Sequence, residues 1–216
     1  MFADRHDAGI RLAERLRDLA GAENAVVVGL PRGGVPVAFE VARVLGAPLD
    51  VIVVRKLGVP FQPELGFGAL GEGGVCVIDR GIVRHANLTP EDMITVERRE
   101  RAELLRRVRR LRGDRAPVDL TGRTVIVVDD GIATGGTVRA ACQVARARGA
   151  SRVVPAVPVG APETIEGLCE VADDVVCLRM PDFFYAIGTW YADFSPTTDD
   201  QVVELLRRAG TGAGGP

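Results

Sequence analysis

Residues 125–137 read VIVVDDGIATGGT, a run of four apolar residues followed by two adjacent acids and a loop of small residues. Consecutive Val and Ile residues are typical of a strand that is covered on both faces, as in a parallel sheet. A loop of Gly, Ala and Thr directly after such a strand is a place where α/β proteins bind ligands. Because the stretch lacks the lysine of the GxxxxGK(S/T) loop, it does not indicate a nucleoside triphosphate site of that kind.

Further Val- and Ile-rich runs also predict strands, at residues 25–30, 49–55, 151–159 and 173–178. Helical periods separate several of these runs, and some of the helices close on a Gly that can serve as a C-cap. This alternation predicts a doubly wound α/β domain with a mainly parallel sheet. Ligands of such domains bind at the carboxyl ends of the strands, where the two acids lie.

The chain has 216 residues, 47% of them apolar, and a formal net charge of −2. This size predicts a single domain over residues 1–209, and the Gly-rich tail at 210–216 is expected to be disordered. The charge provides no basic field that would attract nucleic acid or an anionic membrane. The longest apolar runs are far shorter than the roughly 20 residues of a membrane span. We therefore expect a soluble, cytoplasmic protein without a membrane or nucleic-acid partner.

The cysteines form no CxxC pair and have no His at metal-ligand spacing. We expect buried free thiols rather than a disulfide or a metal site. The residues concerned are Cys76, Cys142, Cys169 and Cys177.

Two segments depart from the strand–helix alternation. Residues 56–80 are rich in Gly and Pro and are long for a connection, which predicts a functional or mobile loop. Residues 89–112 predict a helix with a capping Thr, a Pro at its first position and acids in its first turn. The second half of this helix is rich in Arg. Two hypotheses follow for it: a solvated helix that leans on the body of the protein, or a dimer arm or nucleic-acid contact.

The acids and the small-residue loop predict two halves of one ligand site. The loop at residues 133–137 opens a helix, so several backbone amides and the helix N-terminus can bind a phosphate. Asp129 and Asp130 would repel that phosphate unless they face another part of the same ligand. Vicinal hydroxyls are the natural partners of two carboxylates. A ribose 5-phosphate has both a diol and a phosphate.

At this point the sequence resembles a known family. VIVVDDGIATGGT is similar to the phosphoribosyl pyrophosphate (PRPP) signature of the type I phosphoribosyltransferases. The resemblance implies that Asp129 and Asp130 hold the ribose 2- and 3-hydroxyls. It also implies a Mg²⁺ cofactor, which the two acids would contact through water. The implied 5-phosphate site consists of Ala133, Thr134, Gly135, Gly136 and Thr137.

The resemblance continues at two other strand ends. Residues 29–34, GLPRGG, are similar to the diphosphate loop of the family, in which Arg32, Gly33 and Gly34 would face the leaving diphosphate. Lys56 is the only lysine in the chain, and it stands where related enzymes have an Arg-Lys pair that contacts this group. The compact ammonium of a lysine is not equivalent to the planar guanidinium of an arginine. A single lysine in a chain that otherwise uses arginine therefore indicates a role for Lys56. Lys56 and Arg32 are therefore the candidate catalytic residues, acting by charge neutralisation.

The resemblance also assigns the remaining segments. Residues 57–74 would be a mobile flap that closes over the reaction, within a flap and helical insertion at about 57–113. A small C-terminal hood at about 180–197 would bind the acceptor. The hood is rich in aromatic residues, on which a planar base could stack. The acceptor contacts we expect there are Phe184, Ile187 and Trp190.

The sequence does not identify the acceptor base. Hypoxanthine-guanine enzymes have an acid at the start of the phosphate loop, where this chain has Ala133. The loop itself is more similar to that of adenine phosphoribosyltransferases, whose hood is not matched. The resemblance implies a homodimeric enzyme of nucleotide metabolism that transfers ribose 5-phosphate from PRPP to a nitrogenous base. The alternative is a non-catalytic regulator that senses PRPP.

Overall fold

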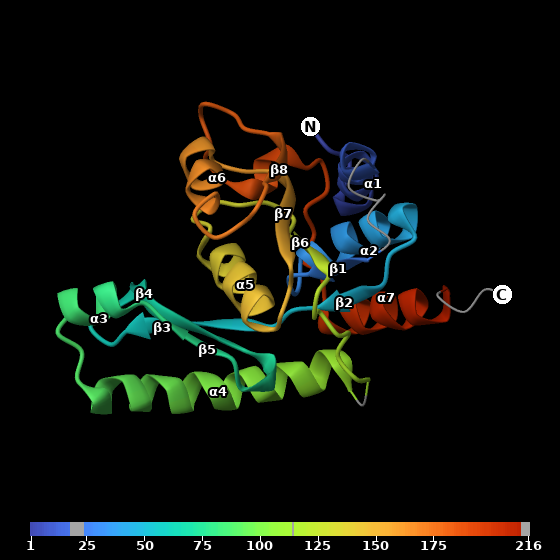
Figure 1. Ribbon diagram of the computed structural model, residues 1–216. Helices are drawn as coiled ribbons and strands as arrows, with labels where there is room; N and C mark the ends of the chain where they lie inside the picture. Colours follow the sequence, from blue (N-terminus) through green and yellow to red (C-terminus); the bar gives the residue numbers. More distant parts are fainter. Residues whose placement is uncertain (18–23, 114, 213–216) are drawn as a thin grey trace.

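The main sheet of the protein follows the Val- and Ile-rich runs of the sequence. The computed structural model describes residues 1–17, 24–113 and 115–212. Within them, a parallel five-stranded sheet has the order β2-β1-β6-β7-β8 (Figure 1). The doubly wound α/β fold is thereby confirmed. Its strands are β1 (Ala25–Gly29), β2 (Leu49–Val51), β6 (Thr124–Val128), β7 (Arg152–Val159) and β8 (Val176–Arg179).

Both faces of this sheet are buried, which explains the uninterrupted apolar runs. Alternate side chains of β6 enter different cores, since Ile126 packs in one cluster and Val127 in the other. The first core is closed by α1 (Arg5–Leu16), α2 (Gly34–Leu45) and α7 (Asp199–Gly212). The second is closed by α5 (Gly136–Ala147) and α6 (Pro162–Leu168). The described helices include none long and apolar enough to cross a membrane.

The C-terminal helix α7 continues further than the sequence predicts. Its turns carry the buried residues Val202 and Leu206, and the helix extends through Gly212. The expectation of disorder from residue 210 is therefore wrong for residues 210–212, since a packed helix propagates one further turn at little cost. The rest of the predicted tail, residues 213–216, lies outside the described residues.

The segment predicted as a loop forms a second sheet. β3 (Val54–Val59), β4 (Gln62–Gly71) and β5 (Cys76–Ile78) are antiparallel, and a short 3-10 helix, η2 (Glu72–Gly74), joins the last two. The expectation of a loop at residues 56–80 is wrong because the glycines allow close strand contact instead of breaking the strands. A Cβ at Gly58 would lie 2.5 Å from the carbonyl oxygen of Pro63. The run predicted as one strand at 49–55 also divides, with β2 in one sheet and β3 in the other.

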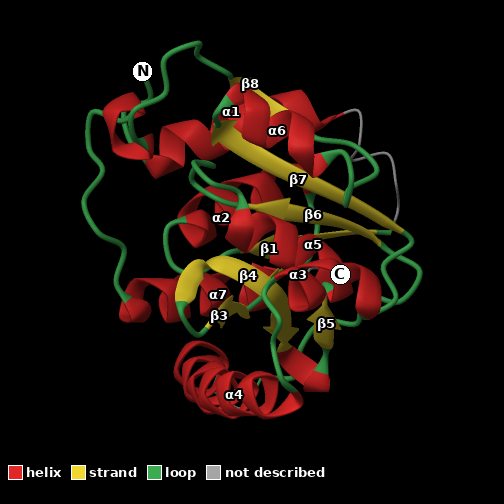
Figure 2. Ribbon diagram, turned by 90° about the vertical axis from the view of Figure 1, so that its left-hand side faces the viewer, coloured by secondary structure: helices red, strands yellow, loops and turns green. Residues whose placement is uncertain are grey.

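The Arg-rich segment is a single helix, α4 (Pro90–Arg112), preceded by α3 (Arg80–His85). It starts with a capping box in which Thr89 and Asp92 exchange hydrogen bonds. Buried Leu104 and Leu111 face the protein, so the helix leans on the body. The second sheet lies between α4 and α5 (Figures 1 and 2).

A buried ion network fixes the end of α4. Arg112 is 6% exposed, and its guanidinium contacts the carboxylates of both Asp50 and Glu72. Glu72 also accepts a hydrogen bond from the amide of Val53, and Asp50 from the amide of Val118. Because these charges are buried and paired, loss of one partner would leave another uncompensated. The network joins α4 to the junction between the two sheets.

The cysteines are free thiols, as expected, but they are not all buried. Cys142 lies in the second core, where burial raises the pKa of its thiol to about 12. Cys177 is partly buried, and Cys76 and Cys169 are exposed. The expectation of burial is wrong for the exposed pair, which lie at β5 and at the end of α6.

Candidate active site

The acid pair, Asp129 and Asp130, follows β6 and touches the loop that follows β1. The amide of Asp130 donates to Asp129 Oδ1 at 2.9 Å. A Cβ at Gly33 would overlap the Asp130 carboxylate, and one at Gly34 would lie 2.6 Å from the carbonyl oxygen of Val128. Glycine is therefore required where these two loops meet. The structure thus brings the predicted diphosphate loop, residues 29–34, against the predicted ribose-binding acids.

Burial and mutual repulsion act on the acid pair. Burial raises the pKa of Asp129 well above its usual range, and the charge of Asp130 adds to this effect. Burial also raises the pKa of Asp130, but the guanidinium of Arg5 opposes that shift. Asp130 Oδ2 accepts from Arg5 and Asp129 Oδ1 accepts from the amide of Asp130, and the two carboxyl side chains also interact with each other.

Two residues that the sequence reasoning missed hold Asp130 in place. Arg5 contacts Asp130 Oδ2 through both Nε and Nη2 at 2.8 Å, donates to the carbonyl oxygen of Ser195 and stacks on the ring of Phe194. The hydroxyl of Tyr191 donates to the Asp130 carbonyl oxygen at 2.6 Å. Arg5 is 125 residues from Asp130, so local sequence patterns carry no signal of this contact.

The phosphate loop, residues 133–137, has the backbone arrangement of an anion site. Gly135 has a left-handed φ of 72°, and α5 begins at the next residue. Thr164 of α6 donates from its hydroxyl to the Ala133 carbonyl oxygen at 2.8 Å, which fixes the loop. Within the described part of the chain, the amides of residues 133–137 donate to no protein acceptor. Unpaired backbone amides at a helix N-terminus favour the binding of a phosphate group.

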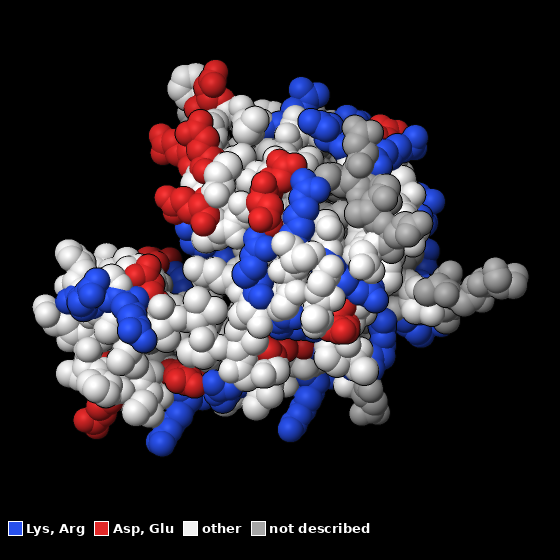
Figure 3. Space-filling model, viewed as in Figure 1, with Lys and Arg blue, Asp and Glu red and all other residues white. Residues whose placement is uncertain are grey.

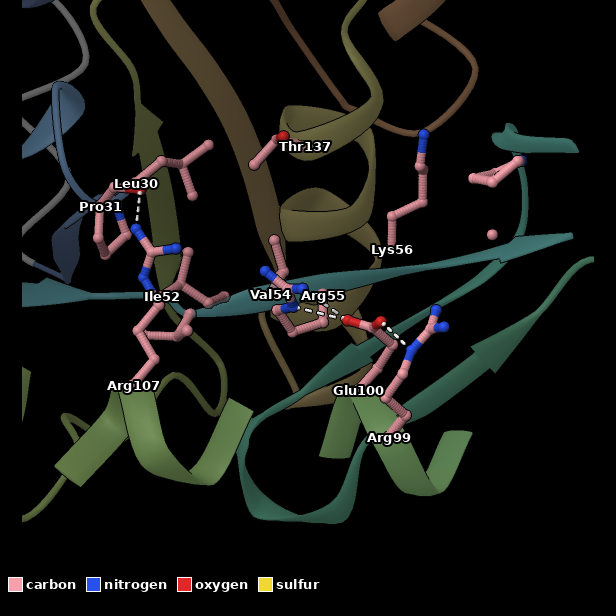
Figure 4. Close-up of a pocket in the computed structure, with 13 residues that line it drawn as sticks. Leu30, Pro31, Ile52, Val54, Arg55, Lys56, Arg99, Glu100, Arg107 and Thr137 are labelled. Carbon is pink, nitrogen blue, oxygen red and sulfur yellow. Dashed lines mark hydrogen bonds and ion pairs between the residues drawn. The ribbon is translucent and has the colours of Figure 1, made fainter. Parts of the chain in front are cut away.

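A cavity of about 380 Å³ lies between Lys56 and the loops after β1 and β6 (Figure 4). Its lining includes Pro31 of the diphosphate loop, Lys56 of β3 and Thr137 of the phosphate loop. Lys56 Nζ lies 3.0 Å from the carbonyl oxygen and 3.3 Å from Oε2 of Glu64, on the neighbouring strand. Arg32 is exposed, and its guanidinium has no hydrogen bond or ion pair to the described residues. Both cations can therefore turn to a ligand.

The same cavity has a wall that the sequence did not predict. Arg99, Glu100 and Arg107 of α4 line it, together with Arg55 of β3. Glu100 pairs with Arg55 at 2.7 Å and with Arg99 at 3.0 Å. The Arg-rich composition of α4 was the available signal, but sequence alone does not reveal which of its arginines face inward.

The three acceptor contacts predicted in the hood are all partly buried but have different neighbours. Ile187 begins the 3-10 helix η3 (Ile187–Trp190), and a Cβ at Gly131 would lie 2.6 Å from its Cγ2, so Ile187 is directly beside the acid pair. Trp190 packs in an apolar cluster with Phe2, and its buried indole N–H has no hydrogen-bond partner among the described residues. Phe184 is half-buried.

The acid pair suits a metal that is shared with a substrate. Groups of three or more His, Cys, Asp or Glu that could hold a metal are not found in the described residues. Two neighbouring carboxylates whose pKa values are raised by burial and repulsion would nevertheless be stabilised by a cation. Mg²⁺ commonly binds through one or two carboxylates, with water and substrate oxygens completing its shell. The residues therefore fit a magnesium ion that arrives with an oxygen-rich ligand.

Comparison with known proteins agrees with this geometry. Residues 3–193 match the family model described as "Phosphoribosyl transferase domain". The chain is 56% identical over 209 residues to the Mycobacterium tuberculosis protein named "Putative phosphoribosyl transferase Rv0571c", covering 97% of this chain and 47% of that protein. It thus spans about half the length of this relative.

A solved structure is similar over nearly the whole chain. The crystal structure of TT1426 from Thermus thermophilus has a TM-score of 0.90 and 45% sequence identity, and the match covers 96% of this chain and 98% of that one. A shorter match, 44% identical over 61 residues, is to a uracil phosphoribosyltransferase of Paenarthrobacter aurescens, over 28% of this chain and 29% of that protein. From its fold, its acid pair and these matches, the chain belongs to the phosphoribosyl transferase domain family.

Proposed function

We propose that the protein catalyses Mg²⁺-dependent transfer of ribose 5-phosphate from PRPP to a nitrogenous base, with release of diphosphate. The observation that carries this proposal is the contact of Gly33 and Gly34 with the acid pair. The loop after β1, the acids after β6 and the amides before α5 then face one ligand. A molecule with a diphosphate, a diol and a terminal phosphate in sequence satisfies all three.

Each part of PRPP has a proposed set of partners. Asp129 and Asp130 accept hydrogen bonds from the ribose hydroxyls through their carboxylates. The amides of residues 133–137 bind the 5-phosphate, with the hydroxyls of Thr134 and Thr137 nearby. The diphosphate binds the amides of Gly33 and Gly34 and the side chains of Arg32 and Lys56. Asp129 and Asp130 would hold a Mg²⁺ ion, which would supply positive charge to the diphosphate.

The chain promotes the reaction mainly by electrostatic stabilisation. Negative charge grows on the diphosphate as its bond to the ribose breaks, and Lys56 and Arg32 are positioned to neutralise it. The ribosyl group gains positive charge at the same time, and water would capture it. Closure of the flap, residues 57–74, excludes that water. Lys56 exchanges its contacts with Glu64 for the diphosphate during closure.

The hood is the proposed acceptor site. Ile187 is adjacent to the acid pair through Gly131, which places the hood beside the ribose. Phe184 and Trp190 supply aromatic surface for a planar base. Ala133 supplies no acid to assist the base. The protein is further proposed to act in the cytoplasm as a homodimer.

The face of the protein in Figure 3 does not favour the alternative, a PRPP-sensing regulator that binds nucleic acid. On the face seen in Figure 3, basic and acidic side chains are interspersed, although basic side chains project along the edge formed by α4. A nucleic-acid site is expected to gather basic side chains on one face or stripe. We therefore propose the enzyme as the main function.

The test combines turnover with binding. Diphosphate release is measured for the protein with PRPP, Mg²⁺ and a panel of bases, and PRPP binding is measured by calorimetry. We expect release with at least one base and no PRPP binding by the Asp129→Asn/Asp130→Asn double variant, whose fold is checked by circular dichroism. Binding without release for any base would favour the sensor instead, and undiminished binding by the double variant would contradict the role of the acids.

A further inference from the structure

One arginine of α4 points toward the diphosphate loop instead of the solvent. Arg107 is half-buried, and its Nη2 donates to the carbonyl oxygen of Pro31 at 3.2 Å. Figure 4 shows its guanidinium rising from α4 toward Leu30 and Pro31. Arg107 thereby reaches the loop whose next residues are Arg32, Gly33 and Gly34.

The position of Arg107 on α4 is unusual for a solvated charge. Residues three and four apart lie on the same side of a helix. Arg107 is three residues after Leu104 and four before Leu111, and these leucines are 2% and 1% exposed. The helix therefore presents a guanidinium on its buried side. The buried ion network at Arg112 fixes this side against the protein.

The cavity that Arg107 enters has an excess of positive charge. Four basic side chains line it, Arg55, Lys56, Arg99 and Arg107, together with the carboxylate of Glu100. Glu100 already pairs with both Arg55 and Arg99. Within the described ranges, Arg107 has no carboxylate at ion-pair distance, and its hydrogen-bond acceptor is a neutral carbonyl.

Burial lowers the pKa of Arg107; the carboxylates of Asp199 and Glu103 oppose this shift, and the positive charges of Arg55 and Arg32 add to it. A guanidinium does not lose its proton in proteins, so this environment is a cost to the free protein. An anion in the cavity would remove that cost. A planar guanidinium with several donors suits a phosphoryl group, which it can bind through two hydrogen bonds.

We propose that Arg107 of the α4 insertion binds the diphosphate of PRPP, together with Arg32 and Lys56. This inference rests on the proposed function, since it adds a residue to the leaving-group side of that site. The proposal gives α4 a direct role in binding. The helix forms the wall of the diphosphate site on the side of β3 that α4 covers. Arg107 is then a group that touches the substrate, while Glu100 only holds Arg55 and Arg99.

The test measures anion binding directly, with inorganic diphosphate as the probe. Affinities for Mg²⁺-diphosphate and for ribose 5-phosphate are determined by calorimetry for the unchanged protein, Arg107→Ala and Arg107→Lys. Arg106→Ala is the matched control, because Arg106 lies on the same helix, carries the same charge, is exposed and pairs with Glu103 outside the cavity. Thermal unfolding followed by circular dichroism checks that each variant is folded.

We expect Arg107→Ala to weaken diphosphate binding about 10- to 100-fold, the range for a lost charge-assisted hydrogen bond. Arg107→Lys should recover only part of the loss, because the ammonium lacks the planar fork. Ribose 5-phosphate binding should change less than about threefold, and Arg106→Ala should bind both ligands as the unchanged protein does. Equal diphosphate affinity for Arg107→Ala and the unchanged protein would overturn the proposal, as would equal losses for both ligands or a failure of the unchanged protein to bind diphosphate.

The outcome is separable from that of the proposed function. A protein that binds diphosphate through Arg107 but releases none from PRPP with any base would refute the enzyme and retain the site. A protein that turns over PRPP equally well with Arg107→Ala would retain the enzyme and refute the site.

Discussion

Replacement of Arg5 by Ala tests how the acid pair is held. Arg5 and Asp130 each have side chains that are 12% exposed, and two nitrogens of Arg5 lie 2.8 Å from one oxygen of Asp130. Removal of one partner from a buried ion pair typically costs about 3–5 kcal/mol, because the other charge stays buried without compensation. We expect Arg5→Ala to lower the free energy of unfolding by that amount.

The control for this prediction lies two turns along α1. Arg11 pairs with Asp7 at 2.8 Å, but its side chain is 48% exposed. Exposed pairs contribute about 0–1 kcal/mol, so Arg11→Ala should change stability little. Both variants are unfolded in urea and followed by circular dichroism, with the slope of the transition compared to confirm a common unfolded state.

A double-mutant cycle isolates the pair itself. Arg5→Ala, Asp130→Asn and the double variant give the coupling energy between the two side chains. We expect about 2 kcal/mol or more, because the pair is buried and joined by a hydrogen bond from Nε and an ion contact from Nη2. A coupling below about 0.5 kcal/mol, or equal losses for Arg5→Ala and Arg11→Ala, would refute the reasoning that Arg5 compensates the charge of Asp130.

Three further predictions concern the ligand site. Lys56→Ala should reduce the rate of diphosphate release far more than it weakens binding of a ribonucleotide 5-phosphate, since Lys56 acts on the leaving group; equal effects in kinetics and calorimetry would contradict that role. Gly33→Ala should weaken PRPP binding and cost about 1–3 kcal/mol of stability, because its methyl group would overlap Asp130; an unchanged dissociation constant would show that the loop tolerates a side chain. Trp190 fluorescence should change when a proven acceptor binds, and no change would assign Trp190 to packing alone.

The sequence predicts the central sheet because that part of the fold is determined locally. Apolar runs such as residues 125–128 can be buried on both faces only in a covered sheet, and the acids and small residues that follow mark the end of a strand. The same locality explains the capping box at Thr89. These features need no knowledge of what lies across the fold.

The parts that the sequence did not predict depend on contacts between distant segments. The glycines of residues 56–80 are compatible with a loop or with closely paired strands, and only the partner strand decides between them. Arg5 and Tyr191 reach Asp130 from opposite ends of the chain. In α4, the direction of Arg107 depends on how Leu104 and Leu111 pack, which a count of arginines does not reveal.

The ion network around Arg112 fixes one end of the β3–β4 hairpin, which is the proposed flap. It fixes Asp50, Val53 and Glu72, which are at the base of the β3–β4 hairpin. The opposite end of the hairpin carries Phe61, whose side chain is in contact with solvent. Displacement during substrate capture should therefore increase from base to tip, so that Lys56 travels a short distance while the tip moves through a larger arc.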